Sequence, residues 1–291
     1  MHALLNINKP SGITSRDAVN RIQRLVRPHK IGHAGTLDPL ASGVLVVAIG
    51  SATRLIEFVQ QQPKRYLGTF LLGQSSTTED VEGEITQLPD APQPSHEALV
   101  QAAAKLTGEI LQRPPAYSAL KVNGRRAYKL ARRGETPDLA PRPVTIHQLN
   151  IVRYEYPVVE LDIGCSSGTY VRSLGRDLAE SLGTAAVMSA LVRTAIGQFK
   201  LEDACELDQL NAETLSQYLL PTQAAVAHLP RYELTEADVI NLRHGRPIAT
   251  SKPATTELLA GFDPQGNVVG MISVAQPGVA TPERILAYDQ P

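Results

Sequence analysis

A single aspartate in a glycine-rich loop is the residue best placed to carry out chemistry. Asp38 lies between Leu37 and Pro39 in the stretch IGHAGTLDPLASG, which leads directly into the apolar run VLVVAIG. The apolar run predicts a buried strand, so we expect the loop to hold the carboxylate rigidly near apolar surroundings. A carboxylate that is removed from water stays ionised only beside a cation. Asp38 therefore needs a basic partner if it is functional, and the alternative is that Asp-Pro simply initiates a turn.

Arg172 and Tyr66 are the candidates to accompany this carboxylate. Arg172 begins a predicted helix after the turn at Gly168, one position from the apolar stripe of that helix, so its side chain can reach inward. Tyr66 lies in a predicted strand from Arg65 to Leu72. Each residue also has an ordinary structural interpretation. A lone arginine is usually a solvated surface residue, and tyrosine is common at half-buried strand positions.

Other familiar sites are missing from the sequence or weak. It contains no Walker A loop, no GxGxxG fingerprint and no GxSxG elbow. His29 and His33 have the spacing of a zinc-binding helix, but Pro28 and Gly32 disfavour a helix there, and we predict no metal site. The two cysteines suit neither a disulfide framework nor a zinc ribbon, and no apolar run approaches the ~18 residues of a membrane span. We therefore expect a cytoplasmic protein with no signal peptide.

The charges are segregated along the chain although the formal net charge is only -1. Residues 16–33 carry five basic residues and one acidic residue, a net charge of +4. Residues 113–142 carry eight basic and two acidic residues, a net charge of +6, whereas residues 200–240 carry two basic and eight acidic ones. Such segregation can create a positive field over one face and attract a polyanion, and the alternative is ordinary solvated helix surface.

The expected elements alternate between strands and helices. A chain of 291 residues is expected to form one large domain and a small one. We predict helices from Ser15 (as the cap) to Val26, from Thr53 to Gln62 and from Ser95 to Leu111, and an acidic helical connection toward Pro221. A helix also follows Gly168, and strands are predicted at 65–72, 144–152, 158–163 and 191–199. From about Arg231 the sequence changes to short β-runs and turns, which indicates a separate small β-rich domain.

Five separated motifs occur along the chain: NKPSGITS at 8–15, GHAGTLDPLASGVL at 32–45, KRY at 64–66, CSSGTYVRSLGRDL at 165–178 and LVR at 191–193. On these motifs the sequence resembles the TruB-type tRNA pseudouridine synthases over nearly its whole length. The resemblance implies an α+β fold, with a mixed, largely antiparallel central sheet flanked by helices and a small C-terminal β-barrel-like PUA domain. It implies a catalytic domain at residues 1–228 with a mobile basic insertion at about 117–141, and an RNA-binding PUA domain at 229–291.

The resemblance also implies roles for individual residues. It assigns the catalytic aspartate to Asp38, the active-site tyrosine to Tyr66 and the arginine that pairs with the aspartate to Arg172. His33 corresponds to a histidine that occupies the space left by flipped bases. The other residues that it places at or near the substrate are Lys9 and Pro10, from an N-terminal motif with a structural role, and Lys64, Tyr170 and Leu191.

The implied reaction is the isomerisation of the uridine at position 55 of the tRNA T loop to pseudouridine. The bond from ribose C1′ to N1 breaks, C1′ joins C5, and C5 loses its proton. Because no electrons are exchanged, no nicotinamide, flavin or other cofactor is expected. The target base must be flipped out of its stack. Asp38 acts in one of two ways, as a nucleophile or as a base that removes a proton from the sugar.

The expected partner is tRNA, which a monomer of this chain binds at the T arm through the basic insertion. Contact with the acceptor stem should be local or weak, because residues 231–291 carry five basic and seven acidic residues. A second candidate function is an RNA-folding factor that bends and releases the T arm without catalysis. A carboxylate paired with an arginine favours the enzyme, because a chaperone has no need of one.

Overall fold

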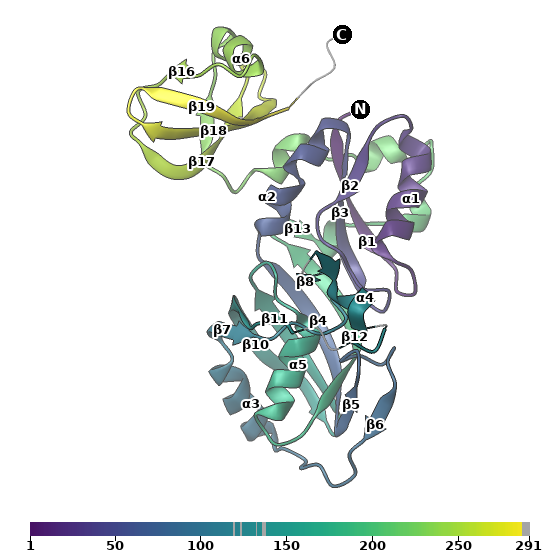
Figure 1. Ribbon diagram of the computed structural model, residues 1–291. Coiled ribbons are helices and arrows are strands. Elements are labelled where there is room, and N and C mark those ends of the chain that lie inside the picture. Colours follow the sequence, from purple (N-terminus) through teal and green to yellow (C-terminus); the bar gives the residue numbers. More distant parts are fainter. Residues whose placement is uncertain (119, 123, 132, 136–137, 287–291) are drawn as a thin grey trace.

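The computed structural model describes residues 1–118, 120–122, 124–131, 133–135 and 138–286 (Figure 1). Its helices are α1 (Ser15–Val26), α2 (Ile56–Gln61), α3 (His96–Lys105), α4 (Ala127–Ala131), α5 (Val171–Glu180) and α6 (Glu236–Arg243). The strands of the larger part are β1 (Ala3–Lys9), β2 (Ile31–His33), β3 (Ser42–Ile49), β4 (Lys64–Leu72), β5 (Gln74–Ser76), β6 (Ile85–Gln87), β7 (Gly108–Gln112), β8 (Lys121–Val122), β9 (Arg125–Arg126), β10 (Arg142–Glu155), β11 (Val158–Cys165), β12 (Ala186–Ile196), β13 (Phe199–Lys200) and β14 (Cys205–Glu206). The smaller part contains β15 (Arg231–Glu233), β16 (Ile248–Ala249), β17 (Thr255–Phe262), β18 (Val268–Gln276) and β19 (Val279–Ile285).

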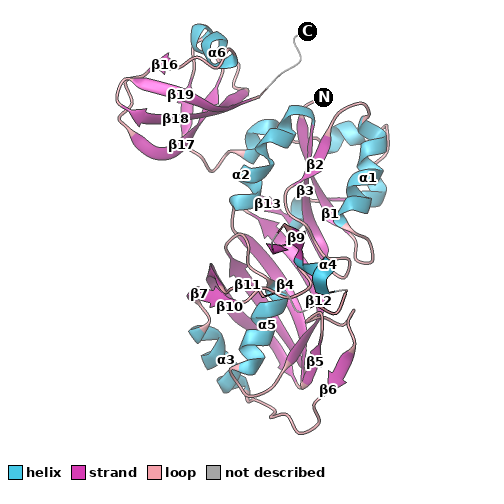
Figure 2. Cartoon of the chain, viewed as in Figure 1, coloured by secondary structure: helices cyan, strands magenta, loops and turns pink. Residues whose placement is uncertain are grey.

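A long mixed sheet forms the centre of the larger part. Among the described residues ten strands take part, in the order β14-β1-β3-β12-β4-β11-β10-β7, with β2 beside β3 and β13 beside β12. The pairs β1–β14 and β3–β12 are parallel, and the other pairs are antiparallel. Figure 2 shows α1 and α2 beside one half of this sheet and α3 and α5 beside the other. The predicted α+β fold with a mixed, largely antiparallel sheet is confirmed.

The two halves of the sheet meet at the β3–β12 pair. We call this pair of strands the seam. Two residue pairs are in register there, Ser42 with Val192 and Gly43 with Arg193. On one side α1 packs its apolar stripe against β1 and β3, and on the other α3 and α5 pack against β4, β10, β11 and β12. Gly43 has a φ of +102°, and a Cβ there would overlap the backbone of Arg193. The seam therefore requires glycine at this position.

The first helix starts as expected, but with a different capping residue. Thr14, not Ser15, is the N-cap of α1, because the Thr14 side chain accepts a hydrogen bond from the Asp17 amide and the Asp17 side chain accepts one from the Thr14 amide. This reciprocal pair is a capping box. Ser15 is thus free for another contact, and its hydroxyl points away from the helix toward the loop of Asp38.

Two predicted helices are shorter or missing because strand pairing takes over their residues. The helix predicted from Ser95 to Leu111 ends at Lys105, where the chain turns at Gly108, with a φ of +102°, and continues as β7 beside β10. The acidic connection before Pro221 forms short 3₁₀ turns rather than an α-helix, and β14 within it pairs with β1. No helix among the described residues combines the length and apolar character that a membrane crossing needs.

The basic segment at 117–141 contains the hairpin β8–β9 and the short helix α4. The strands pair antiparallel, Lys121 with Arg126 and Val122 with Arg125. The sequence Asn123-Gly124 between these strands favours a tight turn, but Asn123 lies outside the described residues. That the segment is mobile stays a prediction.

The smaller part has its own sheet, in the order β15-β17-β18-β19-β16, and the single helix α6. Buried residues such as Leu242 of α6 and Ile272 of β18 pack together between this sheet and the helix. Its other face shares an apolar cluster with the larger part, in which Phe262 and Met271 join Phe58 of α2. The Arg284 guanidinium also lies 2.6 Å from the Glu57 carboxylate. The small β-rich unit is therefore docked against α2 (Figure 1).

Candidate functional site

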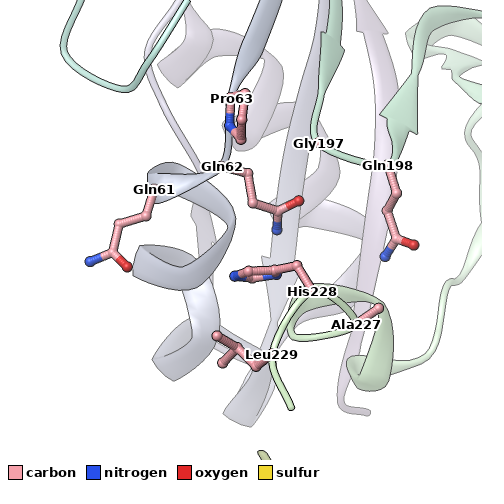
Figure 3. Close-up of a pocket in the computed structure, with 8 residues that line it drawn as sticks. All are labelled: Gln61, Gln62, Pro63, Gly197, Gln198, Ala227, His228 and Leu229. Atoms are coloured by element: carbon pink, nitrogen blue, oxygen red, sulfur yellow. The ribbon is translucent and has the colours of Figure 1, made fainter. Parts of the chain in front are cut away.

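The cavity beside the end of α2 has little capacity for acid-base chemistry (Figure 3). It encloses about 550 Å³, and its lining contains no carboxylate, lysine or arginine. Burial lowers the pKa of His228, its one titratable side chain, so that the ring is neutral at pH 7. None of the candidate residues lies there. Its lining residues are Gln61, Gln62, Pro63, Gly197, Gln198, Ala227, His228 and Leu229.

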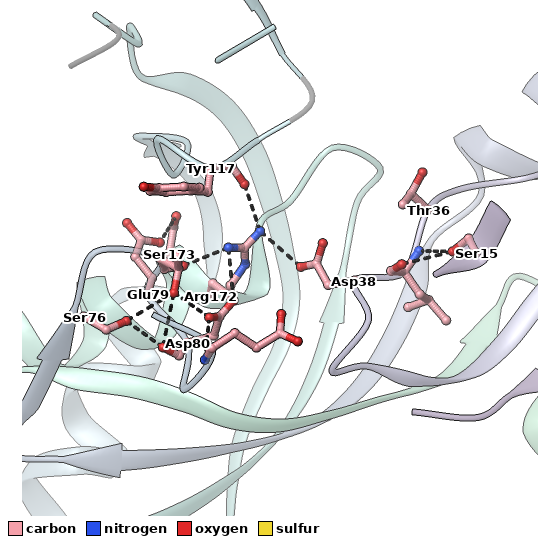
Figure 4. Close-up of polar contacts among 12 residues, drawn as sticks. Ser15, Thr36, Asp38, Ser76, Glu79, Asp80, Tyr117, Arg172 and Ser173 are labelled. Atoms are coloured by element: carbon pink, nitrogen blue, oxygen red, sulfur yellow. Dashed lines mark hydrogen bonds and ion pairs between the residues drawn. The ribbon is translucent and has the colours of Figure 1, made fainter. Parts of the chain in front are cut away.

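A second cavity, of about 230 Å³, brings together most of the candidate residues. It lies at the seam, where the loop before β3 faces the start of α5 (Figure 4). The residues that line it are Thr36, Leu37, Asp38, Tyr66, Tyr117, Ser118, Thr169, Tyr170, Val171, Arg172 and Leu191. Five of the residues predicted from the sequence are therefore neighbours, although they come from four separate segments of the chain.

Arg172 lines this cavity and contacts several of the groups around it. Its Nη2 lies 3.1 Å from Asp38 Oδ2, and its Nη1 lies 3.2 Å from Asp80 Oδ2. The same guanidinium donates to two backbone carbonyls, to Thr78 at 2.8 Å and to Tyr117 at 3.1 Å. Contacts on several sides fix the plane of the guanidinium. The predicted ion pair between Asp38 and Arg172 is confirmed.

The two carboxylates that share Arg172 differ in their exposure to solvent. The Asp80 side chain is 3% exposed, and that of Arg172 is 9% exposed. The Asp38 side chain is 39% exposed, so the expectation of a dry, buried Asp38 is wrong for the free protein. The buried anion is Asp80, and Asp38 presents its carboxylate to the cavity, where a substrate can reach it.

Asp80 is a residue of the site that the sequence patterns do not single out. It follows Glu79, whose φ of +63° is a strained conformation for a residue with a side chain and costs about 1 to 3 kcal/mol. Glu79 is held by an ion pair with Arg176 and by a hydrogen bond from the Ser173 hydroxyl at 2.7 Å. Both partners are on α5, so this helix supplies Arg172 and also fixes the loop that carries Asp80. The feature that points to Asp80 is the strained backbone of its neighbour Glu79, which lies close to the cavity. This feature is seen in the structure and not in the sequence.

The loop of Asp38 rests on Arg193, which is the last residue of the LVR motif. The Arg193 side chain donates to the carbonyls of Val44 at 2.8 Å and Gly35 at 3.0 Å. Arg193 is 2% exposed, and its charge lies below the loop rather than in the cavity. The LVR motif draws attention to Arg193 in the sequence. Only the structure shows that Arg193 supports the Asp38 loop.

Tyr66 lies on β4 beneath the cavity and is almost fully buried. Burial raises the pKa of its hydroxyl, and the positive charge of Arg193 partly opposes this shift. The phenol is therefore protonated at neutral pH. Burial also raises the pKa of the Tyr170 hydroxyl, and that of the nearby Cys165 thiol to about 11. The thiol is thus unsuited to nucleophilic attack, and the Asp38 carboxylate is the candidate reactive group.

Three predicted substrate contacts lie outside this cavity. His33 ends β2, and burial lowers its pKa, so its ring is neutral at pH 7. Lys9 has no exposed surface, and its ammonium donates to the carbonyls of Pro10 at 2.7 Å and Ile13 at 2.8 Å. Lys64 is buried, donates to the Gln60 carbonyl, and has a pKa that burial lowers to about 8. The two lysines hold backbone in the free protein, and the role of His33 beside flipped bases stays a prediction.

Comparison with known proteins shows the family to which this chain belongs. The chain matches a solved structure described as an H/ACA ribonucleoprotein bound to a substrate RNA containing 2′-deoxyuridine, with a TM-score of 0.76 over 98% of this chain and 85% of that one. The identity is 23%, so this likeness shows the fold. A family model described as TruB family pseudouridylate synthase (N terminal domain) matches residues 23–171. A model described as tRNA pseudouridylate synthase B C-terminal domain matches residues 172–227.

Full-length relatives agree with the family models. The tRNA pseudouridine synthase B of an Arthrobacter species is 44% identical over 99% of this chain and 97% of its own length. The enzyme of the same name from Dehalococcoides mccartyi is 38% identical over 100% of this chain and 98% of its own length. The fold and the sequence together define a pseudouridine synthase, an isomerase. The chain belongs to the TruB family of pseudouridylate synthases.

Proposed function

We propose that this enzyme converts uridine 55 in the T loop of tRNA to pseudouridine, with Asp38 as its catalytic group. Relatives named tRNA pseudouridine synthase B over the full length support tRNA as the substrate. The observation that carries the assignment of the site is the cavity in which Asp38 is held by Arg172 and faces Tyr66, Tyr170 and Leu191.

The direct test is to map pseudouridine in unmodified tRNA after incubation with the full-length protein. We expect one new pseudouridine, at position 55, with no added cofactor. Product at another position, or none, would contradict the proposal. An RNA-folding factor without catalysis would accelerate tRNA folding and leave every uridine unchanged.

The reaction requires the groups that line this cavity. The C1′–N1 bond breaks, the base turns, C1′ bonds to C5, and the C5 proton leaves while N1 gains one, so atoms and electrons balance. Asp38 attacks C1′ or removes a proton from the sugar, and both roles require an ionised carboxylate open to the nucleotide. The exposure of Asp38 and its contact with a guanidinium meet this requirement.

Tyr66 is proposed to stack on the flipped base and to carry the C5 proton through its hydroxyl. Replacing Tyr66 with phenylalanine keeps the ring and removes the hydroxyl. We expect tRNA affinity to be retained and the single-turnover rate to fall about 10²- to 10⁴-fold, the usual contribution of a positioned acid or base. Release of tritium from C5-labelled uridine measures this step.

A matched control for this variant is Tyr154→Phe, which removes a hydroxyl that donates to the Pro94 carbonyl outside the cavity. Its tritium release should equal that of the wild type. If Tyr66→Phe also released tritium at the wild-type rate, the hydroxyl would carry no proton and Tyr66 would act by stacking alone.

We propose that the T arm lies along the basic surface of α1 and the basic insertion. Arg16, Arg24 and Arg27 are exposed on or just after α1, whereas Arg21 is paired with Asp208 at 2.7 Å. The insertion adds a basic pocket lined by Arg125, Arg126, Lys129 and Arg133. Cations that neutralise phosphates make RNA affinity strongly dependent on salt.

Replacing Arg16, Arg24 and Arg27 together with glutamine should weaken tRNA binding and reduce its salt dependence. Each phosphate contact that is lost should make the negative slope of log K against log salt shallower by about 0.7 to 0.9, the range between single strands and duplex DNA. The rate at saturating tRNA should be unchanged, because none of the three residues lines the cavity. Titrations between low and physiological salt measure the slope. Arg153→Gln, at an exposed arginine paired with Glu155, is the control, and an equal loss of slope in that variant would contradict the assignment.

We further propose that residues 1–228 form the catalytic domain and residues 229–291 a PUA-like domain that touches the acceptor stem, in a monomeric, cytoplasmic enzyme. The family match ends at residue 227, next to this boundary. A comparison of the affinities of the full-length chain for whole tRNA and for an isolated T-arm stem-loop tests the acceptor-stem contact. Equal affinities would exclude it.

A further inference from the structure

We propose that Ser15 is a positioning residue for Asp38, an inference that rests on the proposed function. The Ser15 hydroxyl accepts a hydrogen bond from the Leu37 amide at 2.8 Å and donates one to the Leu37 carbonyl at 3.0 Å (Figure 4). One side chain thus satisfies both backbone groups of the residue immediately before Asp38. Ser15 is 2% exposed and Leu37 is 4% exposed, so water cannot take over these hydrogen bonds without disturbing the packing.

The residue after Asp38 is tied to the same N-terminal segment. The Gly12 amide donates to the Pro39 carbonyl at 2.8 Å. The segment is itself fixed by the buried ammonium of Lys9, which donates to the Pro10 and Ile13 carbonyls. The segment from Lys9 to Ser15 therefore clamps the Asp38 loop on both sides of the aspartate.

Among the ion pairs and side-chain hydrogen bonds of the described residues, the Asp38 side chain takes part in one, the ion pair with Arg172 across the cavity. Where its carboxylate lies relative to the nucleotide therefore depends on how firmly the loop backbone is held. Reaction rates respond steeply to such placement, and an error of about 1 Å can cost a factor of about 10². Loss of the Ser15 hydroxyl should accordingly reduce the rate of the chemical step.

The contact does not belong to the capping of α1. Thr14 and Asp17 cap that helix by themselves, through reciprocal hydrogen bonds at 3.1 and 3.0 Å. Thr14 is exposed and makes no contact with the Asp38 loop among the hydrogen bonds of the described residues. Two adjacent hydroxyls thus have separate tasks, and they provide a matched pair of variants.

The experiment compares Ser15→Ala with Thr14→Ala in the full-length protein. We expect both to lower the melting temperature modestly, because each loses hydrogen bonds near the start of α1. Only Ser15→Ala should lower the single-turnover rate at saturating tRNA, by about 10- to 100-fold. Its dissociation constant for tRNA should match that of the wild type, since Ser15 is buried and holds no phosphate.

The outcomes separate this inference from the proposed function. If wild-type protein makes no pseudouridine in tRNA, the proposed function fails. If wild-type protein is active and Ser15→Ala reacts at the wild-type rate, or if Thr14→Ala loses rate equally, Ser15 has no positioning role. A loss in Ser15→Ala that appears only as weaker tRNA binding would overturn the inference as well.

Discussion

Replacing Asp38 with asparagine is expected to abolish pseudouridine formation while tRNA binding persists. The amide has nearly the shape of the carboxylate but cannot attack C1′ or accept a sugar proton. The rate should fall by at least about 10⁴-fold, since removal of a catalytic nucleophile can cost about 10⁶ in kcat. Affinity should be equal or slightly higher, because the substitution removes one negative charge from a surface that binds a polyanion.

The measurement is product formation under single turnover, together with a binding titration of the same protein. Asp162→Asn is a suitable control, because Asp162 lies outside the Asp38 cavity and is engaged by Arg65 at 2.6 Å. That variant should retain the wild-type rate. Normal product formation by Asp38→Asn would remove Asp38 from the catalytic role, and loss of tRNA binding would make it a binding residue instead.

Replacing Arg172 with methionine is expected both to inactivate the enzyme and to destabilise it. The stability effect comes mainly from Asp80, which is 3% exposed and would be left as an unpaired buried charge. Breaking a buried ion pair from one side costs about 3 to 5 kcal/mol of unfolding free energy. Asp38, at 39% exposure, can be solvated and should add little to that cost. Activity is lost because the carboxylate of Asp38 no longer has its guanidinium partner.

A double substitution separates the two effects. Adding Asp80→Asn to Arg172→Met removes the stranded charge, so the double variant should be more stable than Arg172→Met alone. It should remain inactive, because Asp38 is still without its partner. Urea unfolding and single-turnover assays on the same preparations measure both quantities. Equal stability of the single and double variants would show that Asp80 is not the source of the destabilisation.

The sequence predicts the parts of the fold that local pattern controls. The apolar run before Gly50 becomes β3, the segment around Tyr66 becomes β4, and the helix after Gly168 becomes α5. The end of α3 and the 3₁₀ turns of the acidic segment could not be predicted in this way. There, pairing of β7 with β10 and of β14 with β1 overrides local preference, and both partners are distant in sequence.

The candidate site shows the same division between local pattern and tertiary contact. The motifs locate Asp38, Tyr66 and Arg172, and the structure brings them into one cavity. They do not indicate that Arg172 also holds Asp80, because the two residues are 92 positions apart and Asp80 lies outside the motifs. The sequence also makes Ser15 look like an ordinary helix cap. Its actual partner, Leu37, is 22 positions away and could not be predicted from local pattern.

The seam between β3 and β12 separates the elements that carry the two charges of the Asp38–Arg172 ion pair. Asp38 is carried by the loop that enters β3, whereas Arg172 is carried by α5, which packs on β12. The two charges thus belong to opposite sides of a junction that two register pairs and the hydrogen bonds from Arg193 to Val44 and Gly35 hold together in the described chain. The separation of the two charges therefore depends on how the two halves of the sheet are held together.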